Sequence, residues 1–346
     1  MSSLKYAAIR SAFQLLSFSG LPRLLRRYSR CKGVIFTLHR VLPEDVGAFQ
    51  PNSILQVKPQ FLEEAIKQSR ASGFEIVDLD EATRRISSDQ PTQPFVVFTF
   101  DDAYRDNLVH ALPILQRLKC PFTLYVPTAF VDGSGEVWWQ ALEDIIKSND
   151  AIKVDGDGNS VMMDTSTNEK KNNVFNKIYW NMRAMPEPQR VELINSLARD
   201  NGLDIEAHCK ELIMNWNELK TFADEPLCTI AAHTVHHYEL AKLPEDDARK
   251  EIRDSTEVLT KKFGKKPKHF SFPIGSLRAA GPREHQLAAE LGFETAVTTR
   301  PGGLYARHKD SLSALPRISL NGNFQEGHFL DVFLTGAIFS ILPSSL

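Results

Sequence analysis

The sequence predicts an α/β fold built on a parallel sheet or barrel. Short apolar runs recur along the chain, and several are apolar throughout, as in strands buried on both faces of a parallel sheet. Segments with helical periodicity lie between these runs. The 346 residues, 42% hydrophobic and 24% charged, can bury a sizeable core. Length alone fits either one large α/β barrel or two modest domains.

The expected elements alternate along most of the chain. Apolar, β-rich runs predict strands, and a spacing of apolar residues near 3.6 predicts helices. Strands are expected at residues 33–38, 74–79, 95–100, 122–126, 228–232, 269–272, 295–298 and 316–320, and helices at 60–71, 107–118, 246–262 and 283–291.

The alternation stops over residues 133–226. This stretch contains helical segments on both sides of a polar loop expected at 155–173, and it holds all four tryptophans of the chain. No fixed repeat or long low-complexity linker separates it from its surroundings. We therefore expect a helical insertion on one connection of a barrel domain that spans 33–328.

The two ends differ in charge from this domain. Residues 1–32 carry seven basic and no acidic side chains among apolar residues, which predicts a basic amphipathic segment. Such a segment binds an anionic membrane surface, or it packs on the domain with a solvated basic face. Residues 329–346 begin with an apolar stretch too short to span a bilayer. Because the N-terminal segment lacks a cleavage site and is densely basic, we expect a cytoplasmic protein, peripheral at the inner membrane face.

The net charge bears on the possible partners, and the cysteine content bears on the cellular compartment. The formal net charge of -2 gives no reason to expect a nucleic-acid partner. Four widely spaced cysteines form neither a CxxC motif nor a disulfide framework, which fits a reducing compartment.

The first motif is the pair Asp101-Asp102, which directly follows the apolar run 95–100. A strand that ends in two carboxylates places them at the edge of the sheet where α/β proteins bind ligands. Adjacent carboxylates repel each other unless a cation or a shared proton relieves the repulsion. The structural alternative is an N-cap for a helix that begins near Arg105.

The second motif follows the apolar run 228–232 and contains His233, His236 and His237. His233 and His237 are four residues apart, so in a helical turn both imidazoles would project from one face. Such a pair suits a divalent cation of the zinc type. His236, three residues after His233, is an alternative ligand.

Together the two motifs predict a catalytic metal site. Two histidines and one carboxylate leave coordination positions open for water and substrate, whereas structural zinc sites are closed by four ligands. The second carboxylate is then free to act as a general base.

These motifs resemble those of the polysaccharide deacetylases with a NodB-type domain (carbohydrate esterase family 4). The matching residues are Thr99-Phe100-Asp101-Asp102, the His-Thr-x-x-His at 233–237, and the run from Phe270 to Gly275. The similarity covers roughly 33–132 and 215–320. It implies a distorted (β/α)7–8 barrel, a zinc-type cation and hydrolysis of an N-acetyl group on a sugar.

Carried over by residue, the resemblance makes Asp101 the general base. Asp102, His233 and His237 become the metal ligands. The resemblance also implies that a backbone N–H, such as that of Tyr104, helps to hold the oxyanion.

Other candidate site residues match the motifs of the family less directly. Pro273 and Gly275 resemble the family's third motif, which shapes the wall of the site, although a plain turn is the alternative. That motif usually brings an arginine that orients the base, and here Arg317 is the candidate, unless it lies at the surface. The late histidine motif that protonates the leaving amine is missing. His39, which follows the run 33–38, is the candidate for this role because one branch of the family has a similar early histidine; an Asp or Glu of the insertion is the alternative.

The expected substrate is an N-acetylated glycan of the cell envelope or an exopolysaccharide, or its lipid-linked precursor. Trp138 and Trp139 are expected near the catalytic rim, where aromatic faces stack on sugars, although a core position is the alternative. A rival function is a metal hydrolase of the same architecture that acts on a non-sugar amide. A rival of another class is a non-catalytic glycan-binding module.

Overall fold

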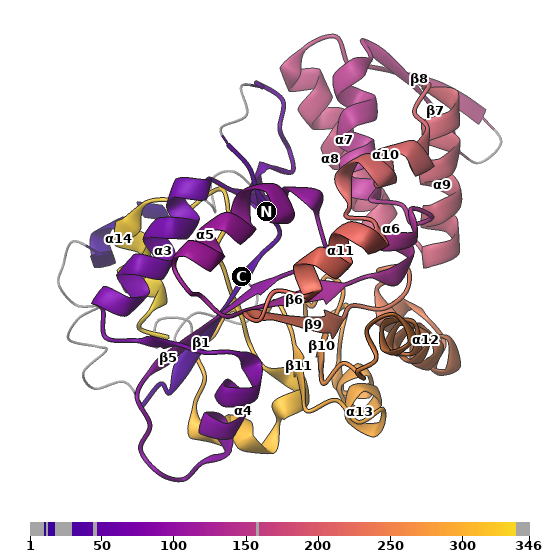
Figure 1. The fold of residues 1–346 in the computed structure, drawn as a ribbon. Coiled ribbons are helices and arrows are strands. Elements are labelled where there is room, and N and C mark those ends of the chain that lie inside the picture. Colours follow the sequence, from indigo (N-terminus) through magenta and orange to yellow (C-terminus); the bar gives the residue numbers. More distant parts are fainter. Residues whose placement is uncertain (1–9, 12, 18–29, 44–46, 157–158, 337–346) are drawn as a thin grey trace.

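The apolar runs of the sequence form a central parallel sheet (Figure 1). The structure is a computed structural model that describes residues 10–11, 13–17, 30–43, 47–156 and 159–336. The strand order is β11-β10-β9-β6-β5-β1-β12, and β4 pairs with the beginning of β5. The strands are β1 (Gly33–Leu38), β4 (Glu75–Ile76), β5 (Phe95–Phe100), β6 (Phe122–Val126), β9 (Cys228–Ala232), β10 (His269–Ser271), β11 (Thr295–Val297) and β12 (Ile318–Ser319).

The segment around β12 closes the sheet into a distorted barrel. The Leu315 N–H donates to the Ala296 carbonyl, and the Thr298 N–H donates to the Leu315 carbonyl, both at 2.9 Å, beside β11. A few residues later, Ile318 and Ser319 pair with β1 in parallel register. One short segment thus joins both edges of the sheet, and the predicted α/β barrel is confirmed.

Helices cover the outside of the barrel (Figure 1). Their apolar faces bury residues such as Leu62 and Ile66 of α3 and Ile252 and Leu259 of α12. These helices are α3 (Pro59–Ala71), α4 (Leu79–Ser87), α5 (Leu112–Arg117), α12 (Glu245–Phe263), α13 (Pro282–Glu290) and α14 (Gly327–Phe333). Short pieces complete this part: β2 (Arg40–Val41), β3 (Gln56–Val57), η1 (Ser53–Leu55), η3 (Leu240–Lys242), η4 (Ala306–Asp310) and η5 (Leu312–Ala314).

Several expected elements of the barrel are wrong in part, and the strand predicted at 316–320 is limited to β12. The strand predicted at 74–79 is limited to β4, because the Asp78 side chain caps the next helix by accepting the Glu81 N–H at 2.8 Å. The helix predicted at 107–118 begins as a π-helical turn, η2 (Asn107–Ala111), and continues as α5. Pro113 lies at this junction and lacks the N–H that a regular α-helix would use.

The connection from β6 to β9 carries a separate lobe beside the barrel (Figure 1). Where the sequence predicted a polar loop at 155–173, residues 151–156 and 159–164 pair as two antiparallel strands. The loop prediction also fails at 168–173, which begin helix α8, because the Thr167 hydroxyl caps that helix by accepting the Lys170 N–H at 3.3 Å. The lobe consists of α6 (Thr128–Asp132), α7 (Trp138–Ser148), β7 (Ala151–Gly156), β8 (Asn159–Asp164), α8 (Asn168–Ala184), α9 (Glu187–Asp200) and α10 (Ile205–Leu212). Helix α11 (Trp216–Ala223) then returns the chain to the barrel, where Phe222 packs on Phe122 of β6 at a centroid distance of 5.3 Å.

The described part of the N-terminal segment packs against the C-terminal part of the chain. The buried Phe13 ring lies edge-on to Phe324 and Phe333, with centroids 5.5 and 5.9 Å away. Arg10 donates to the Asn323 carbonyl at 2.6 Å and also pairs with Glu326. Most of the predicted basic segment 1–32, and the end of 329–346, lie outside the described residues. Within the described part of the chain, no helix combines the length and apolar character that crossing a bilayer requires.

Candidate active site

The carboxyl end of β5 delivers Asp101 and Asp102 to one end of the barrel. The Asp101 N–H donates to the Leu38 carbonyl at 2.9 Å, which continues the pairing of β5 with β1. Asp102 and Ala103 then adopt left-handed conformations, with φ of 76° and 58°, which are rare outside glycine. This change of chain direction sends two buried carboxylates to different partners.

Asp101 forms a bidentate ion pair with Arg317. Nη1 donates to Oδ1 and Nη2 donates to Oδ2, each at 2.7 Å. The guanidinium is fully buried and also donates to the oxygens of Thr99, Ser271 and Thr298, so all five N–H donors are used. Burial by itself raises the pKa of Asp101, but the adjacent Arg317 charge and its hydrogen bonds outweigh burial and hold that pKa well below its ordinary value.

Arg317 occupies the barrel interior and is 0% exposed, which excludes the surface position left open by the sequence. It lies in the segment that joins β11 to β1, and its N–H donates to the Arg300 carbonyl at 3.0 Å. Closure of the barrel therefore carries this side chain beneath Asp101.

The histidine motif is an irregular loop, so the helical turn expected at 233–237 is wrong. Thr234 and His237 have φ of 65° and 59°. The Thr234 hydroxyl accepts the His237 N–H at 3.0 Å, which stabilises the turn. This loop nevertheless brings the rings of His233 and His237 to a centroid distance of 4.8 Å.

His236 points to a different partner. Its Nδ1 lies 2.6 Å from Oε1 of Glu251 on α12, and the same carboxylate accepts the His236 N–H at 2.9 Å. Its side chain is 43% exposed. The structure thus separates His236 from the other two histidines, which the sequence spacing did not do.

Asp102, His233 and His237 form a buried cluster whose possible ligand atoms all lie within 4.8 Å of one another. Asp102 Oδ1 is 3.5 Å from His233 Nε2 and 3.3 Å from His237 Nε2, and it has no hydrogen-bond partner. His233 Nδ1 lies 2.7 Å from the Ser271 carbonyl, which turns Nε2 toward the cluster. The donor set and the orphaned carboxylate oxygen fit a divalent cation of the zinc type.

The electrostatics of the cluster suit this interpretation. Burial lowers the pKa of His237 to about 3, and the nearby Asp102 charge only partly opposes this effect. The imidazole is therefore neutral at pH 7, which is the form that binds a metal.

Trp138 and Trp139, at the start of α7, are both buried. They line one cavity together with Asp102, His233 and His237. The Trp139 ring lies 5.0 Å from the His237 ring, and its Nε1–H donates to the Tyr104 hydroxyl at 2.9 Å. Tyr104 is fully buried, and its side chain acts here by holding Trp139. The role of the Tyr104 N–H toward an oxyanion stays a prediction.

Pro273 and Gly275 form a tight turn that presents the residue between them. The Gly275 N–H donates to the Pro273 carbonyl at 2.6 Å, and Ile274 between them lines the cavity. A side chain at Gly275, which has φ of 61°, would collide with the Thr299 backbone nitrogen at 2.6 Å. The turn and the wall, given as alternatives from the sequence, are therefore one feature.

These residues converge on one cavity of about 220 Å³. His39, at the end of β1, is part of its wall, as the sequence predicted. The cavity is lined by His39, Asn52, Ile54, Leu55, Asp101, Asp102, Trp138, Trp139, Tyr179, Arg183, His233, His237, Ile274 and Thr299.

Sequence reasoning missed Ser271, Tyr179 and Arg183. Ser271 contacts Arg317 through its hydroxyl and His233 through its carbonyl. Its place between two phenylalanines in a strand was the available signal. Tyr179 and Arg183 lie on α8 of the lobe, and nothing in their local sequence indicates that they reach the cavity.

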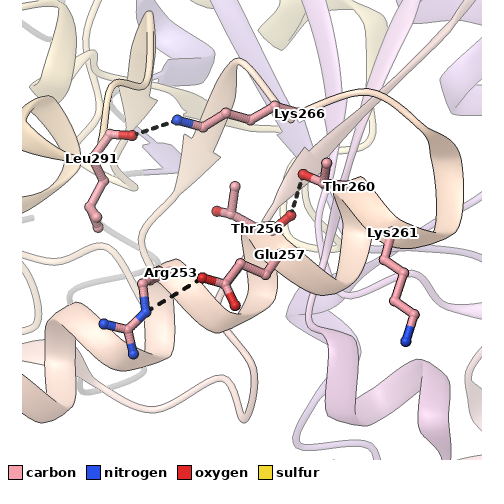
Figure 2. A pocket seen from close by; sticks show the side chains of 7 residues that line it. All are labelled: Arg253, Thr256, Glu257, Thr260, Lys261, Lys266 and Leu291. Atoms are coloured by element: carbon pink, nitrogen blue, oxygen red, sulfur yellow. Dashed lines mark hydrogen bonds and ion pairs between the residues drawn. The ribbon is translucent and has the colours of Figure 1, made fainter.

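Size alone does not identify the site, because other hollows are larger, among them one of about 670 Å³ near Cys228 and Lys268. Figure 2 shows the residues that line another hollow, beside α12, where Arg253 pairs with Glu257 and Lys266 donates to the Leu291 carbonyl. Its volume is about 420 Å³. Lys266 and Leu291 precede β10 and β11, so this hollow lies toward the amino ends of the strands. Asp101, Asp102 and the histidines follow the carboxyl ends, where α/β folds bind ligands.

Comparison with known proteins agrees with this geometry. The family model described as "Polysaccharide deacetylase" matches residues 88–296, more than half of the chain. YxkH of Bacillus subtilis (strain 168), provisionally named a polysaccharide deacetylase, is 22% identical over 270 residues, which cover 76% of this chain and 67% of YxkH.

Solved structures share the fold. The deacetylase PplD of Streptococcus pyogenes, in complex with acetate, has a TM-score of 0.56 and 18% identity, and the match covers 84% of this chain and 92% of PplD. A de-N-acetylase from Aggregatibacter actinomycetemcomitans has a TM-score of 0.54 and 11% identity, covering 87% of this chain and 99% of the other. The family expected from the motifs is confirmed: this chain belongs to the polysaccharide deacetylases.

Proposed function

We propose that this protein is a metal-dependent N-deacetylase that hydrolyses the acetamide of an N-acetylated glycan. The observation that carries the proposal is one cavity in which a buried Asp-His-His cluster adjoins a second carboxylate held by a buried arginine. The names of the structural neighbours, deacetylase and de-N-acetylase, support the same reaction.

Asp102, His233 and His237 would hold the cation, and zinc fits this donor set. A divalent cation bound there would polarise the acetyl carbonyl and lower the pKa of water. The Ser271 carbonyl fixes the His233 ring, so that its Nε2 lone pair faces the cluster.

Asp101 is the proposed general base. Arg317 keeps it ionised, so its carboxylate can accept the proton of the attacking water. The water oxygen bonds to the acetyl carbon, the C–N bond breaks, and the amine takes up a proton. His39 lines the cavity and is the proposed donor of that proton. The products are acetate and a free amine on the sugar.

The proposed substrate is a glycan of the cell envelope, an exopolysaccharide or a lipid-linked precursor. Trp138 and Trp139 supply aromatic surface to the cavity, and aromatic surface suits a sugar ring better than a small polar amide.

The test measures acetate release from N-acetylglucosamine oligomers by the zinc-loaded full chain, beside linear and cyclic non-sugar amides. Preferential release from the oligomers supports the proposal, and release only from the other amides supports the rival hydrolase. Binding of oligomers without any hydrolysis, with Asp101→Asn indistinguishable from the unchanged protein, would identify a glycan-binding module instead.

We also propose that the protein is cytoplasmic and contacts the inner membrane face through residues 1–32. Five of the seven basic side chains of this segment support the proposal, since Arg10 pairs with Glu326 and Lys32 donates to backbone carbonyls at the end of α4. Flotation of the full chain with anionic but not neutral liposomes, reduced when Arg23, Arg26, Arg27 and Arg30 become Gln, is the expected result. Absence of flotation with anionic liposomes would contradict it.

A further inference from the structure

Helix α8 places the positively charged guanidinium of Arg183 in the wall of the cavity. Tyr179 and Arg183 are one helical turn apart on α8 and line the cavity together with residues from the barrel. The Tyr179 ring packs on Trp138 at a centroid distance of 5.1 Å, which fixes this face of α8 against the site. Arg183 retains 17% exposure of its side chain.

The proposed hydrolysis does not use the Arg183 guanidinium. Asp101 already has Arg317 as its partner, and the three ligands proposed for the metal ion do not include Arg183. Arg183 therefore has another role, either within the fold or toward the substrate.

The hydrogen bonds of Arg183 leave donors for a ligand. Its Nε donates to Glu239 Oε1 at 2.8 Å, and the guanidinium also interacts with the Tyr179 hydroxyl, which leaves other terminal N–H groups without an acceptor among the described residues. The Glu239 oxygen is shared, because Lys242 Nζ lies 2.9 Å from it. A guanidinium with free terminal N–H groups binds planar or tetrahedral anions in a bidentate manner.

We propose that Arg183 is a specificity residue that binds an anionic group of the glycan, a carboxylate or a phosphate close to the N-acetyl sugar. This inference rests on the proposed deacetylase function. A cation held by Asp102, His233 and His237 would add to the positive charge of the Arg183 guanidinium, and together they would favour a negatively charged substrate over a neutral one of equal size.

The experiment compares three soluble probes: a neutral N-acetylglucosamine oligomer, N-acetylglucosamine 1-phosphate and N-acetylmuramic acid. Acetate release gives kcat/KM for the unchanged protein, Arg183→Gln and Arg183→Lys. Arg199→Gln is the matched control, because Arg199 is on α9 of the same lobe with a side chain 74% exposed.

We expect Arg183→Gln to lower the ratio of kcat/KM for the preferred anionic probe to that for the neutral oligomer by tenfold or more, mainly through KM. Arg183→Lys restores part of the ratio, and Arg199→Gln leaves it unchanged. Which anionic probe is affected distinguishes phosphate from carboxylate. An equal loss on all three probes, or no loss of preference, would overturn the inference.

Binding separates this inference from the proposed function. In an Asp101→Asn background, calorimetry measures the affinity for the two anionic probes with and without Arg183→Gln. Tenfold weaker binding supports Arg183 as an anion site even when no acetate is released from any probe, which would refute only the deacetylase proposal. Equal binding by both proteins contradicts the role of Arg183.

Discussion

The two walls of the cavity use their arginines in opposite ways. On the barrel side, Arg317 is fully buried and donates all of its N–H groups to oxygens of the protein. On the lobe side, Arg183 is partly exposed and donates through Nε to one carboxylate. A guanidinium with every donor filled fixes a neighbour in place, whereas one with free donors can accept a ligand.

The same contrast extends to the other residues of each wall. Barrel strands end in Asp101, Asp102 and His233, whose positions are fixed by paired backbone and buried partners. The lobe supplies Trp138, Tyr179 and Arg183 from helices outside the sheet. We infer that the barrel wall carries the reaction and the lobe wall carries recognition, and the following changes test that division.

Loss of a cluster ligand should have the largest effect. Asp102→Ala or His233→Ala removes a ligand to the proposed cation, which supplies several kcal/mol of transition-state stabilisation. We expect a loss in kcat of about 10³-fold or more. We also expect zinc to raise the Tm of the unchanged protein and not that of these variants. His236→Ala is the control, because His236 pairs with Glu251 outside the cluster. Ligand variants that keep both activity and the zinc response would contradict the assignment.

Asp101→Asn should lower kcat by about 10²–10⁴-fold, because it removes the general base but keeps the shape of the side chain. It also leaves the buried Arg317 charge without its counter-charge, so the free energy of unfolding should fall by about 3–5 kcal/mol. Acetate release and urea unfolding measure the two effects, and activity within threefold of the unchanged protein would place the base elsewhere.

On the lobe side, Glu143 of α7 should affect stability in a pH-dependent way. It is buried and accepts the Asn52 N–H at 3.0 Å, and burial is the main reason that its pKa is raised from 4.5 to about 7. Between these values the folded protein holds a proton that the unfolded chain releases, so this group lowers stability as pH rises through that window. Relative to Glu143→Gln, the unchanged protein should therefore lose about 1–3 kcal/mol between pH 4.5 and 8.

Urea unfolding of both proteins at pH 4.5 and pH 8 measures this difference. An identical pH dependence for the two proteins would show that Glu143 titrates normally in the fold.

The smallest effect is expected at the contact between barrel and lobe. Tyr104→Phe leaves the buried Nε1–H of Trp139 without its acceptor and should cost about 1 kcal/mol of unfolding free energy. Tyr125→Phe is the matched control, because Tyr125 is also fully buried but its hydroxyl has no partner among the described residues. Equal thermal stability of the two variants would mean that the Tyr104 hydrogen bond contributes nothing.

Local sequence determined much of the barrel. The runs at 33–38, 95–100, 122–126 and 228–232 match β1, β5, β6 and β9, because central strands of a parallel sheet are largely apolar on both faces; β1, β5 and β6 are buried throughout. The Asp-Asp and His motifs were placed correctly at strand ends, because each directly follows one of these apolar runs. Their convergence follows from parallel pairing, which brings the carboxyl ends of strands to one edge.

Only the tertiary structure decided which partners those residues have. The burial of Arg317 beneath Asp101 depends on how the segment around β12 closes the barrel, and the separation of His236 from His237 depends on two left-handed residues in a loop. The reach of Arg183 into the cavity depends on the packing of α8 against Trp138. Periodicity shows which face of an element is apolar, but contacts between elements distant in sequence arise only when the whole chain packs.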